Sequence, residues 1–365
     1  MFAPRLEIDL GKIQHNAHTL VERLARHDIS VTGVTKATLG SPEVARAMLL
    51  AGVNDLADSR IENIEAMRRS NIHARMSLIR SPMISQAKRV VTSADVSFNT
   101  EIAVVRRLSR EAQKLDRIHA VVLMVELGDL REGIMPEDLV VAVRETLGLP
   151  NIVLKGIGTN LACRSGASPD DINMGELSRL AALIEETFDI SLEIVSGGNS
   201  ANLQWVFGSV DTGRINNLRL GESILLGCET LHRHVIDGLH TDAITLVAEV
   251  IESKMKPTQP RGDIGESTFG TCAVVKDRGT IRQSILAIGN QDVDPSGMYP
   301  PKGTEILGSS SDHLLVTSSR DDVSVGSEMK FQLNYSALLR AMTSPLVTNS
   351  FKSASNVSNL RQIAC

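Results

Sequence analysis

The fold is decided by a strand–helix–strand unit that reads Val96-Ser97-Phe98, then Thr100-Glu101 with an amphipathic stretch to Leu115, then Val121-Val122-Leu123-Met124-Val125. The two β-branched and apolar runs predict buried strands, and the apolar residues at helical spacing between them predict a helix. Parallel strands need a crossover connection of about this length, so the unit predicts an α/β protein.

The same alternation extends in both directions from this unit. Helix ends can be read between the runs: Ser41-Pro42 begins one helix that Gly52 ends, and Pro136 and Pro169 begin two more. Eight strands and their helices over about 225 residues are typical of a (β/α)8 TIM-type barrel, although an open doubly wound sheet has the same local pattern. The six further strands are expected at 31–34, 55–57, 76–79, 154–158, 192–195 and 217–220.

The pattern changes after Leu231. Strand-like runs at 245–251, 282–288, 313–317 and 329–333 are separated by Gly-, Pro- and Asp-containing loops, which predicts an all-β domain. We therefore expect the barrel over residues 1–231 and the β domain over residues 232–345. Residues 346–365 are rich in Ser, Asn and Thr and are expected to be a disordered tail.

Composition excludes several classes of protein. The 365 residues are 42% hydrophobic and carry a net charge of −5, and 3% are aromatic, which argues against a nucleic-acid binder. No apolar run reaches the roughly 20 residues that span a bilayer, and the N-terminus lacks the features of a signal peptide. The four cysteines are scattered without CxxC spacing, so neither a disulfide framework nor a metal site is indicated. We expect a cytoplasmic protein.

Three chemically informative features coincide with strand ends. Lys36 follows the first strand, the Gly-rich turn Ser196–Ser200 follows the seventh, and Arg219 lies in the eighth. An amine, a turn that can hold phosphate and a cation at one face of a barrel suit a phosphorylated aldehyde cofactor such as pyridoxal phosphate (PLP). Taken singly, each also fits a surface lysine, an ordinary loop or a surface arginine, so only their joint placement favours a cofactor site.

The whole chain to about residue 345 resembles the fold-type III PLP enzymes, the alanine racemase group, and within it the ornithine racemase branch. The motifs behind this resemblance are Leu6–Asn16, Val34–Ala37, Val125–Gly133, Gly156–Leu161, Ser196–Ser200, Asn217–Glu222 and Ser311–Leu314. The resemblance implies a (β/α)8 barrel followed by a C-terminal β domain, PLP as cofactor and an amino acid as substrate. It also implies a homodimer in which the β domain of one subunit completes the site of the other.

The resemblance also implies roles for single residues. Lys36 binds PLP covalently and, once substrate displaces it, serves as a base at Cα. Arg219 meets the pyridine nitrogen, with Asn160 supporting it. Because a guanidinium keeps its proton, that nitrogen stays unprotonated, which favours racemisation over transamination. Arg131 helps to position the substrate carboxylate, although it can equally be a surface partner of Glu132.

Phosphate binding is implied for the turn at Gly198 and for Ser200, with the backbone of Gly221 and Glu222. The chain departs from the family here, because Leu39-Gly40 stands where alanine racemases carry a phosphate-binding tyrosine.

A second departure concerns proton transfer. The family's catalytic tyrosine is replaced by Phe269, which has no proton to give. We predict that Asp312-His313 supplies the second base, because histidine titrates near neutrality, and a structural role for this loop is the alternative. Glu266 and Asp292 are reserve candidates.

The expected substrate is a basic amino acid, ornithine first and lysine next, because buried ammonium groups need a carboxylate partner. The acidic candidates are Asp312, Asp292, Asp294 and Glu222, each of which can also be a solvated loop residue. Two alternatives remain. A non-catalytic PLP carrier has a short chain without a β domain, and a fold-type III decarboxylase needs a cysteine acid, for which Cys272 is the candidate.

Overall fold

The computed structural model describes residues 2–208, 211–266, 277–319 and 323–352. The chain divides into two compact units, Leu10–Thr241 and Met1–Asp9 with Asp242–Cys365. Each unit is described by itself below. Within the described residues, no helix combines the length and the apolar character needed to cross a membrane.

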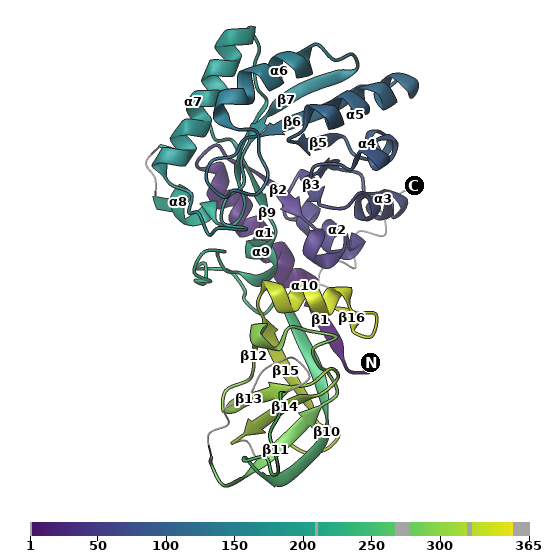
Figure 1. Cartoon of the computed structure of the whole chain (residues 1–365), viewed down its shortest axis with the longest axis vertical. Coiled ribbons are helices and arrows are strands. Elements are labelled where there is room, and N and C mark those ends of the chain that lie inside the picture. The colour runs from purple at the N-terminus through teal and green to yellow at the C-terminus, as the bar shows by residue number, and fades with distance from the viewer. Residues whose placement is uncertain (1, 209–210, 267–276, 320–322, 353–365) are drawn as a thin grey trace. The chain divides into compact units, whose positions relative to one another are not determined.

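The unit Leu10–Thr241 is built on a closed barrel of eight parallel strands, in which β2 pairs with β9 to close the ring (Figure 1). All eight strands predicted from the sequence are confirmed, and closure excludes the open doubly wound sheet. The strands are β2 (Ser30–Val34), β3 (Asp55–Asp58), β4 (Arg75–Leu78), β5 (Val96–Asn99), β6 (His119–Met124), β7 (Ile152–Gly158), β8 (Ile194–Gly198) and β9 (Asn217–Leu220).

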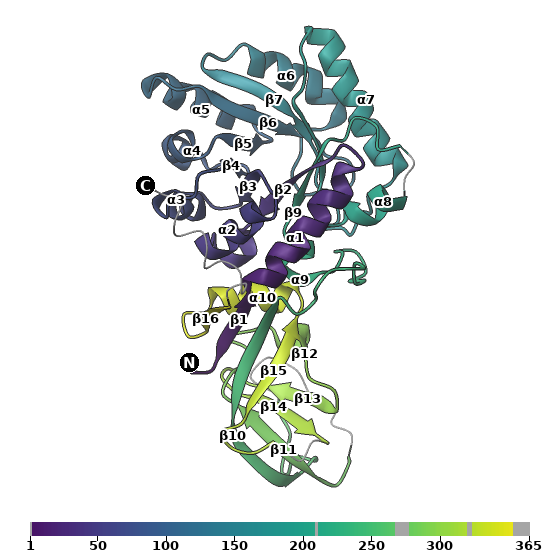
Figure 2. The same ribbon diagram turned by 180° about the vertical axis from the view of Figure 1, so that it is seen from behind.

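Helices surround this barrel (Figures 1 and 2). They are α1 (Leu10–Ala25), α2 (Pro42–Leu50), α3 (Ile61–Arg69), α4 (Ala87–Ser93), α5 (Ile102–Lys114), α6 (Leu139–Leu147), α7 (Asp171–Phe188), α8 (Asn202–Gly208) and α9 (Glu222–Leu226), with short 3₁₀ turns at Lys36–Thr38, Ile84–Gln86 and Pro136–Asp138. The helix starts follow local chemistry. The Ser41 side chain accepts from the Val44 N–H at the start of α2, and Asp170 rather than Pro169 caps α7.

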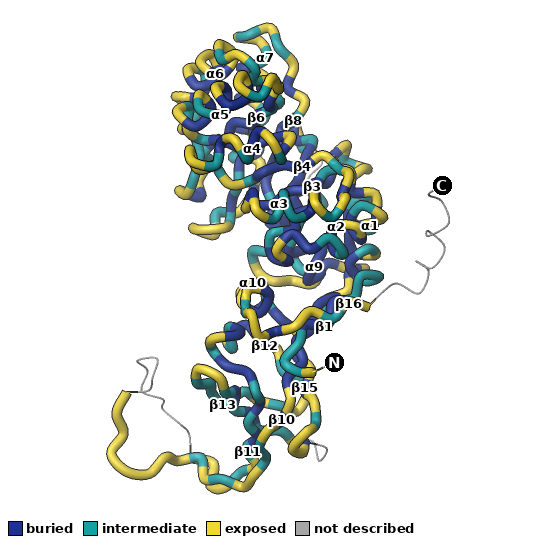
Figure 3. The backbone as a smooth tube through the Cα atoms, turned by 90° about the vertical axis from the view of Figure 1, so that its right-hand side faces the viewer, coloured by how far each residue is buried: buried dark blue, intermediate teal, exposed yellow. Residues whose placement is uncertain are grey.

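The barrel strands form the buried centre of this unit, with the exposed surface on the helices around them (Figure 3). At the end where the strands begin, Arg75 pairs with Asp55 at 2.6 Å and with Glu193 at 2.7 Å, and Lys155 also pairs with Glu193. This charged cluster occupies the N-terminal end of the barrel. The C-terminal strand ends, where barrel enzymes carry their chemistry, hold the residues described in the next subsection.

The second unit is an eight-stranded sheet in the order β12-β15-β10-β11-β14-β13, with β1 pairing to β10 and to β16. The four β-domain strands predicted from the sequence are confirmed as β10, β11, β14 and β15. The elements are β1 (Arg5–Asp9), β10 (Ile244–Pro257), β11 (Thr280–Leu286), a 3₁₀ turn at Pro295–Gly297, β12 (Met298–Tyr299), β13 (Thr304–Ser309), β14 (Leu314–Ser318), β15 (Glu328–Leu333), α10 (Tyr335–Thr343) and β16 (Thr348–Lys352).

The domain limits differ from those expected at both ends of the barrel. β1 belongs to the sheet unit, because it pairs antiparallel with β10 and buries Leu6 and Ile8. The barrel unit continues past residue 231 to Thr241, because Asn16 on α1 exchanges two hydrogen bonds of 2.7 and 2.8 Å with the backbone of His240.

The C-terminal expectations also need correction. The all-β domain contains the helix α10, whose start is capped by the Asn334 side chain. Part of the expected disordered tail forms the strand β16, which pairs parallel with β1. Its polar composition predicted a tail, but strand pairing uses backbone groups that this composition does not reveal. Residues 353–365 lie outside the described part of the chain.

Candidate active site

Lys36 sits on a turn that is fixed from the neighbouring strand. It begins the 3₁₀ turn that follows β2, and Thr35 before it donates its hydroxyl to a carboxylate oxygen of Asp58 at 2.9 Å. Asp58 ends β3, is fully buried, and also accepts from the Arg60 N–H and the Asn63 side chain at 2.9 Å each. One carboxylate therefore holds the position from which the Lys36 side chain extends.

The surroundings of Lys36 favour its neutral amine. Burial lowers the pKa of Lys36 below its ordinary value, and the positive charges of Arg131 and Arg219 lower it further, while Cys163 and Asp58 act in the opposite direction. The neutral amine is the form that adds to an aldehyde and that accepts a proton.

Arg219 lies inside the barrel and is only 5% exposed. Its guanidinium donates to Ser196 Oγ, to the Thr159 carbonyl at 2.8 Å and to Asn160 Oδ1 at 3.3 Å. It also lies over the Phe98 ring, 5.1 Å from the centroid. A guanidinium has five N–H groups, and among the described residues two of those on Arg219 have no partner, so they are available to an acceptor on a ligand.

The charge of Arg219 persists at neutral pH. Burial lowers the pKa of Arg219 to about 10, which still leaves the group protonated at pH 7. Arg219 is therefore a hydrogen-bond donor only, and a ring nitrogen facing it would act as the acceptor without gaining a proton.

The glycine turn after β8 requires glycine at one position. Gly198 has φ of +143°, and a Cβ there would lie 2.3 Å from Asn202 Oδ1. That oxygen accepts from the Asn199 N–H at 3.0 Å, so it cannot move away without losing the contact. Glycine at this position therefore lets the backbone of the turn pass close to the Asn202 side chain.

Two serine hydroxyls join this turn to the start of α9. Ser200 Oγ lies 3.0 Å from Ser223 Oγ and accepts from the Ser223 N–H at 3.2 Å. Gly221 precedes α9 and packs against the end of β2, where a Cβ would lie 3.1 Å from Val34 Cβ. The expected phosphate residues thus lie beside the Lys36 turn.

Glu222 follows Gly221 and is itself buried. Its carboxylate forms an ion pair with Arg233 in the same unit. Its side chain is therefore engaged in a structural contact, which leaves the backbone as the part expected to meet a phosphate.

Arg131 and Glu132 come from the loop after β6. They form an ion pair, with Arg131 Nη2 at 2.6 Å from Glu132 Oε1, as the surface-partner alternative for Arg131 anticipated. The charge of Arg131 nevertheless acts on Lys36, and the charge of Glu132 acts on Arg219. Both residues are therefore close enough for their charges to act on Lys36 and Arg219.

Cys163 is a member of this group that sequence reasoning missed. Its Sγ accepts from the Asn160 amide at 3.1 Å and from the Asn199 amide at 3.5 Å. The sequence analysis looked for paired cysteines and for CxxC spacing, neither of which identifies a single thiol in a loop. Its position five residues after β7, in the loop that carries Asn160, was the available signal.

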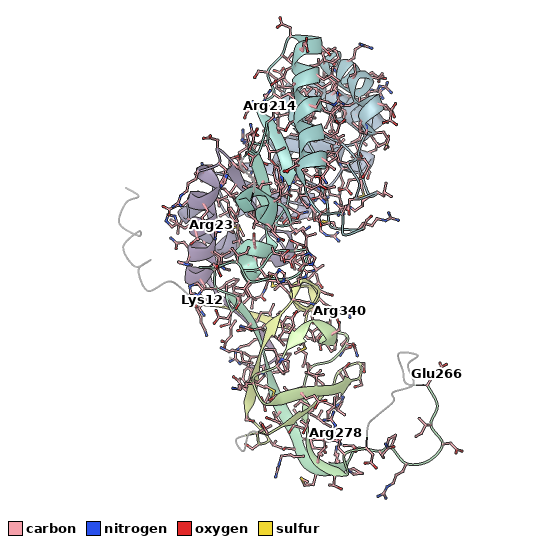
Figure 4. The ribbon with its side chains drawn as sticks, turned by 90° about the vertical axis from the view of Figure 1, so that its left-hand side faces the viewer. Lys12, Arg23, Arg214, Glu266, Arg278 and Arg340 are labelled. Atoms are coloured by element: carbon pink, nitrogen blue, oxygen red, sulfur yellow. The ribbon has the colours of Figure 1, made fainter. Side chains whose placement is uncertain are left out.

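The remaining predicted residues belong to the sheet unit. Asp312 Oδ1 lies 2.7 Å from His313 Nδ1, so the carboxylate and the imidazole are paired. Asp292 is buried and accepts from Ser344 Oγ at 2.8 Å. Glu266 lies in a loop that extends away from the strands of its unit (Figure 4). Phe269 and Cys272, which entered the proton-transfer and decarboxylase arguments, lie outside the described residues.

The residues of the barrel end fit PLP by their chemistry. Lys36 offers an amine for the aldehyde, Arg219 has unpartnered N–H groups in a buried position for the ring nitrogen, and Gly198 and Ser200 form a turn suited to phosphate. These residues come from β2, β8 and β9, which are neighbours in the closed barrel.

Comparison with known proteins agrees with this fit. Residues 8–227 match the family described as alanine racemase, N-terminal domain. The chain belongs to the alanine racemase family. It is 37% identical over 349 residues to the ornithine racemase of Acetoanaerobium sticklandii, covering 94% of this chain and 98% of that protein. It is 38% identical over 349 residues to the lysine racemase of Thermotoga maritima, covering 95% and 98%. The resemblance to the ornithine racemase branch is confirmed.

Solved structures confirm the fold. The alanine racemase of Clostridium difficile 630 has a TM-score of 0.73 at 19% identity, covering 97% of both chains. The D-threonine aldolase of Filomicrobium marinum also has a TM-score of 0.73, at 14% identity, covering 93% of this chain and 88% of that one. Since one fold serves a racemase and an aldolase, the reaction must be argued from the site.

Proposed function

We propose that this protein is a PLP-dependent amino-acid racemase that interconverts the L and D forms of ornithine or lysine. The observation that carries the proposal is the placement of Lys36 beside the buried, charged Arg219 at one end of the barrel. The two relatives that match almost the whole chain, an ornithine racemase and a lysine racemase, support the same reaction and substrate class.

Each residue of the site has a definable task in this reaction. Bound PLP supplies an electron-withdrawing group that makes the substrate Cα–H acidic. Lys36 holds the cofactor and, as a neutral amine, accepts the proton from Cα. Arg219, oriented by Asn160, hydrogen-bonds the ring nitrogen without protonating it, which favours return of a proton to Cα over other outcomes. Gly198 and Ser200 hold the phosphate.

The Arg131–Glu132 ion pair supports a substrate with a charge at each end. A substrate carboxylate can replace Glu132 on Arg131, and Glu132 is then left to pair with the side-chain ammonium of ornithine or lysine. Alanine offers only the first of these exchanges. Two of the acids predicted from the sequence, Glu222 and Asp292, already have structural partners. Glu132, which the sequence analysis did not name as a substrate-binding acid, pairs at the barrel end with Arg131, a partner that a substrate carboxylate can replace.

Assembly follows the family expectation. We propose a homodimer in which the sheet unit of one subunit contributes to the site of the other, with Asp312 and His313 as the residues it would bring. A monomeric mass in light scattering, together with full activity, would refute this arrangement.

The experiment that tests the function compares kcat/KM for L-ornithine, L-lysine, L-alanine and L-serine by chiral chromatography. Preference for ornithine or lysine supports the proposal, and a higher kcat/KM for alanine refutes the substrate class. Release of CO₂ would indicate a decarboxylase, and bound PLP without turnover would indicate a carrier. Borohydride reduction should leave the PLP adduct on Lys36, and an adduct on any other lysine would refute the cofactor assignment.

One substitution tests whether Glu132 recognises the side chain of the substrate. Glu132→Gln should lower kcat/KM for ornithine about fivefold while leaving the value for alanine unchanged, since a partly exposed charge pair contributes about 1 kcal/mol. An equal loss for both substrates would show that Glu132 does not read the side chain.

A further inference from the structure

We propose that Cys163 is the second proton carrier of this site, exchanging a proton between its Sγ and the substrate Cα from the side opposite Lys36. The inference rests on the proposed racemase function, because a racemase must remove a proton from one side of Cα and deliver one to the other. It assigns to the barrel unit a step for which the sequence suggested Asp312-His313.

The hydrogen bonds of Cys163 hold its sulfur in place. The Asn160 and Asn199 amides both donate to Sγ, at 3.1 and 3.5 Å, and Asn199 Nδ2 also donates to Asn160 Oδ1 at 3.2 Å and to the Leu161 carbonyl at 2.9 Å. Cys163 is exposed, so its thiol is accessible at the surface of the barrel unit. An oriented and accessible sulfur is what proton transfer to a bound substrate requires.

Cys163 and Lys36 follow two strands that are separated around the barrel. Cys163 follows β7 and Lys36 follows β2, and these strands are three places apart around the eight-stranded ring, with β8 and β9 between them. Arg219 stands on β9, within that interval, and is bonded to Asn160, the residue that also holds Cys163. A planar ligand anchored at Arg219 would thus have the amine and the thiol approaching from different strand ends.

A second observation points to a ligand at this place. Arg219 is more than nine-tenths buried, and two of its N–H groups have no partner among the described residues. The side chains of Lys36, Arg131 and Arg219 all interact electrostatically with Cys163. The two amide donors, from Asn160 and Asn199, and the guanidinium charges of Arg131 and Arg219 would compensate the negative charge left on Sγ after it gives up a proton.

Every proton that moves in the proposed step is accounted for. In the L-to-D direction, for a substrate whose Cα–H faces Lys36, the Lys36 amine takes the Cα proton and becomes an ammonium. The S–H bond of Cys163 breaks and its proton forms the new Cα–H bond, which leaves a thiolate. Proton exchange with water then returns Lys36 to the amine and Cys163 to the thiol. The reverse direction uses the same steps in the opposite order, and no oxidant or reductant takes part.

The chain contains a matched control thiol. Cys228 lies in the same unit, and burial raises the pKa of its thiol to about 11. Substituting Cys228 therefore removes a thiol from the same unit without touching the group around Arg219.

The first test measures exchange of the Cα proton of each ornithine enantiomer in D₂O by NMR. In Cys163→Ala, racemisation should fall about 100-fold or more, because general acid–base groups contribute at least that much. Exchange should persist for the enantiomer whose proton faces Lys36 and be lost for the other. Cys163→Ser restores a hydrogen-bond acceptor but not an efficient proton carrier, so it should not rescue the activity. Cys228→Ser should behave like the wild type.

The second test does not depend on turnover. Iodoacetamide should alkylate Cys163 in the cofactor-free protein at least 10-fold faster than Cys228, as read by peptide mass spectrometry. PLP reduced onto Lys36 with borohydride should slow alkylation of Cys163 severalfold, because both groups share one space. Unchanged alkylation after this treatment would place Cys163 outside the cofactor site and overturn the inference.

The outcomes separate this inference from the proposed function. If the wild type exchanges neither enantiomer of any amino acid tested, the racemase function and this inference fail together. If the wild type racemises and Cys163→Ala keeps its activity within threefold, only the inference fails. The same holds if exchange is lost for one enantiomer alone in His313→Ala and not in Cys163→Ala. Equal loss of exchange for both enantiomers in Cys163→Ala, with rescue by Cys163→Ser, would show a structural role and also overturn it.

Discussion

His119 makes the stability of the barrel depend on pH in a way that can be worked out from its surroundings. It begins β6, is 1% exposed, and its Nε2 lies 2.8 Å from Ser97 Oγ. Burial lowers the pKa of His119 to about 4 from 6.5. The folded protein therefore holds this imidazole neutral over a range in which the unfolded chain protonates it.

The direction and the size of the change in stability with pH follow from this difference in pKa. As pH falls below 6.5, the unfolded state binds a proton that the folded state does not, so the free energy of unfolding decreases. With one pKa unit worth about 1.4 kcal/mol, the loss is about 2 kcal/mol at pH 5 and approaches about 3 kcal/mol near pH 4.

The assay compares urea unfolding of the wild type and of His119→Gln between pH 8 and pH 5. Glutamine removes the titration and leaves the carboxylates of the protein unchanged, so their contributions cancel in the comparison. The wild type should be the more stable at pH 8, and its advantage should shrink by about 2 kcal/mol at pH 5. The exposed His73→Gln serves as the matched control. A stability difference that does not change with pH would refute the reasoning about burial.

Three further predictions concern the site. Asp58→Ala removes the acceptor of three hydrogen bonds, so it should lower the free energy of unfolding by about 3 kcal/mol in a denaturant titration. It should also slow attachment of PLP to Lys36, measured by the absorbance of the bound cofactor. Gly198→Ala forces a Cβ to 2.3 Å from Asn202 Oδ1 and should weaken PLP binding at least 10-fold in a fluorescence titration. The control is Gly175→Ala in α7, where no atom lies within 4 Å of the new Cβ. This variant should raise the free energy of unfolding by about 0.5–1 kcal/mol. Because burial lowers the pKa of Lys36, pyridoxal should attach there at a lower pH than at exposed lysines, and attachment that requires the same pH would show the amine to be solvated.

The barrel could be predicted because some of its strands bury both faces and are continuous apolar runs, whereas strands with polar residues, such as Asp55–Asp58, were located by their alternation with helices. Val121 to Val125 is such a run, and the strand it predicts is present. The pairing of the first strand of the sheet unit was harder to predict from the sequence. Leu6 and Ile8 alternate with polar residues, which marks a strand but does not reveal that its partner lies some 240 residues later, at Ile244–Val247.

Some residues of the candidate site could likewise be located from the sequence, and others could not. Lys36, Arg219 and the glycine turn could be located because strand ends of a barrel converge, and the expected contact between Asn160 and Arg219 is present. Cys163 and Glu132 could not, because their placement depends on loop conformation, which local sequence patterns do not determine.

The pairing of β1 with β10 and β16 means that one unit is made from both ends of the chain, with the whole barrel inserted between them. During synthesis, residues 5–9 leave the ribosome first but have no partner until residues 244–257 have been made, so the barrel can close while this first strand waits unpaired. An extension attached at the N-terminus therefore continues from a strand that is paired on both sides, and removal of the first nine residues takes that strand out of the sheet while leaving every strand of the barrel in place.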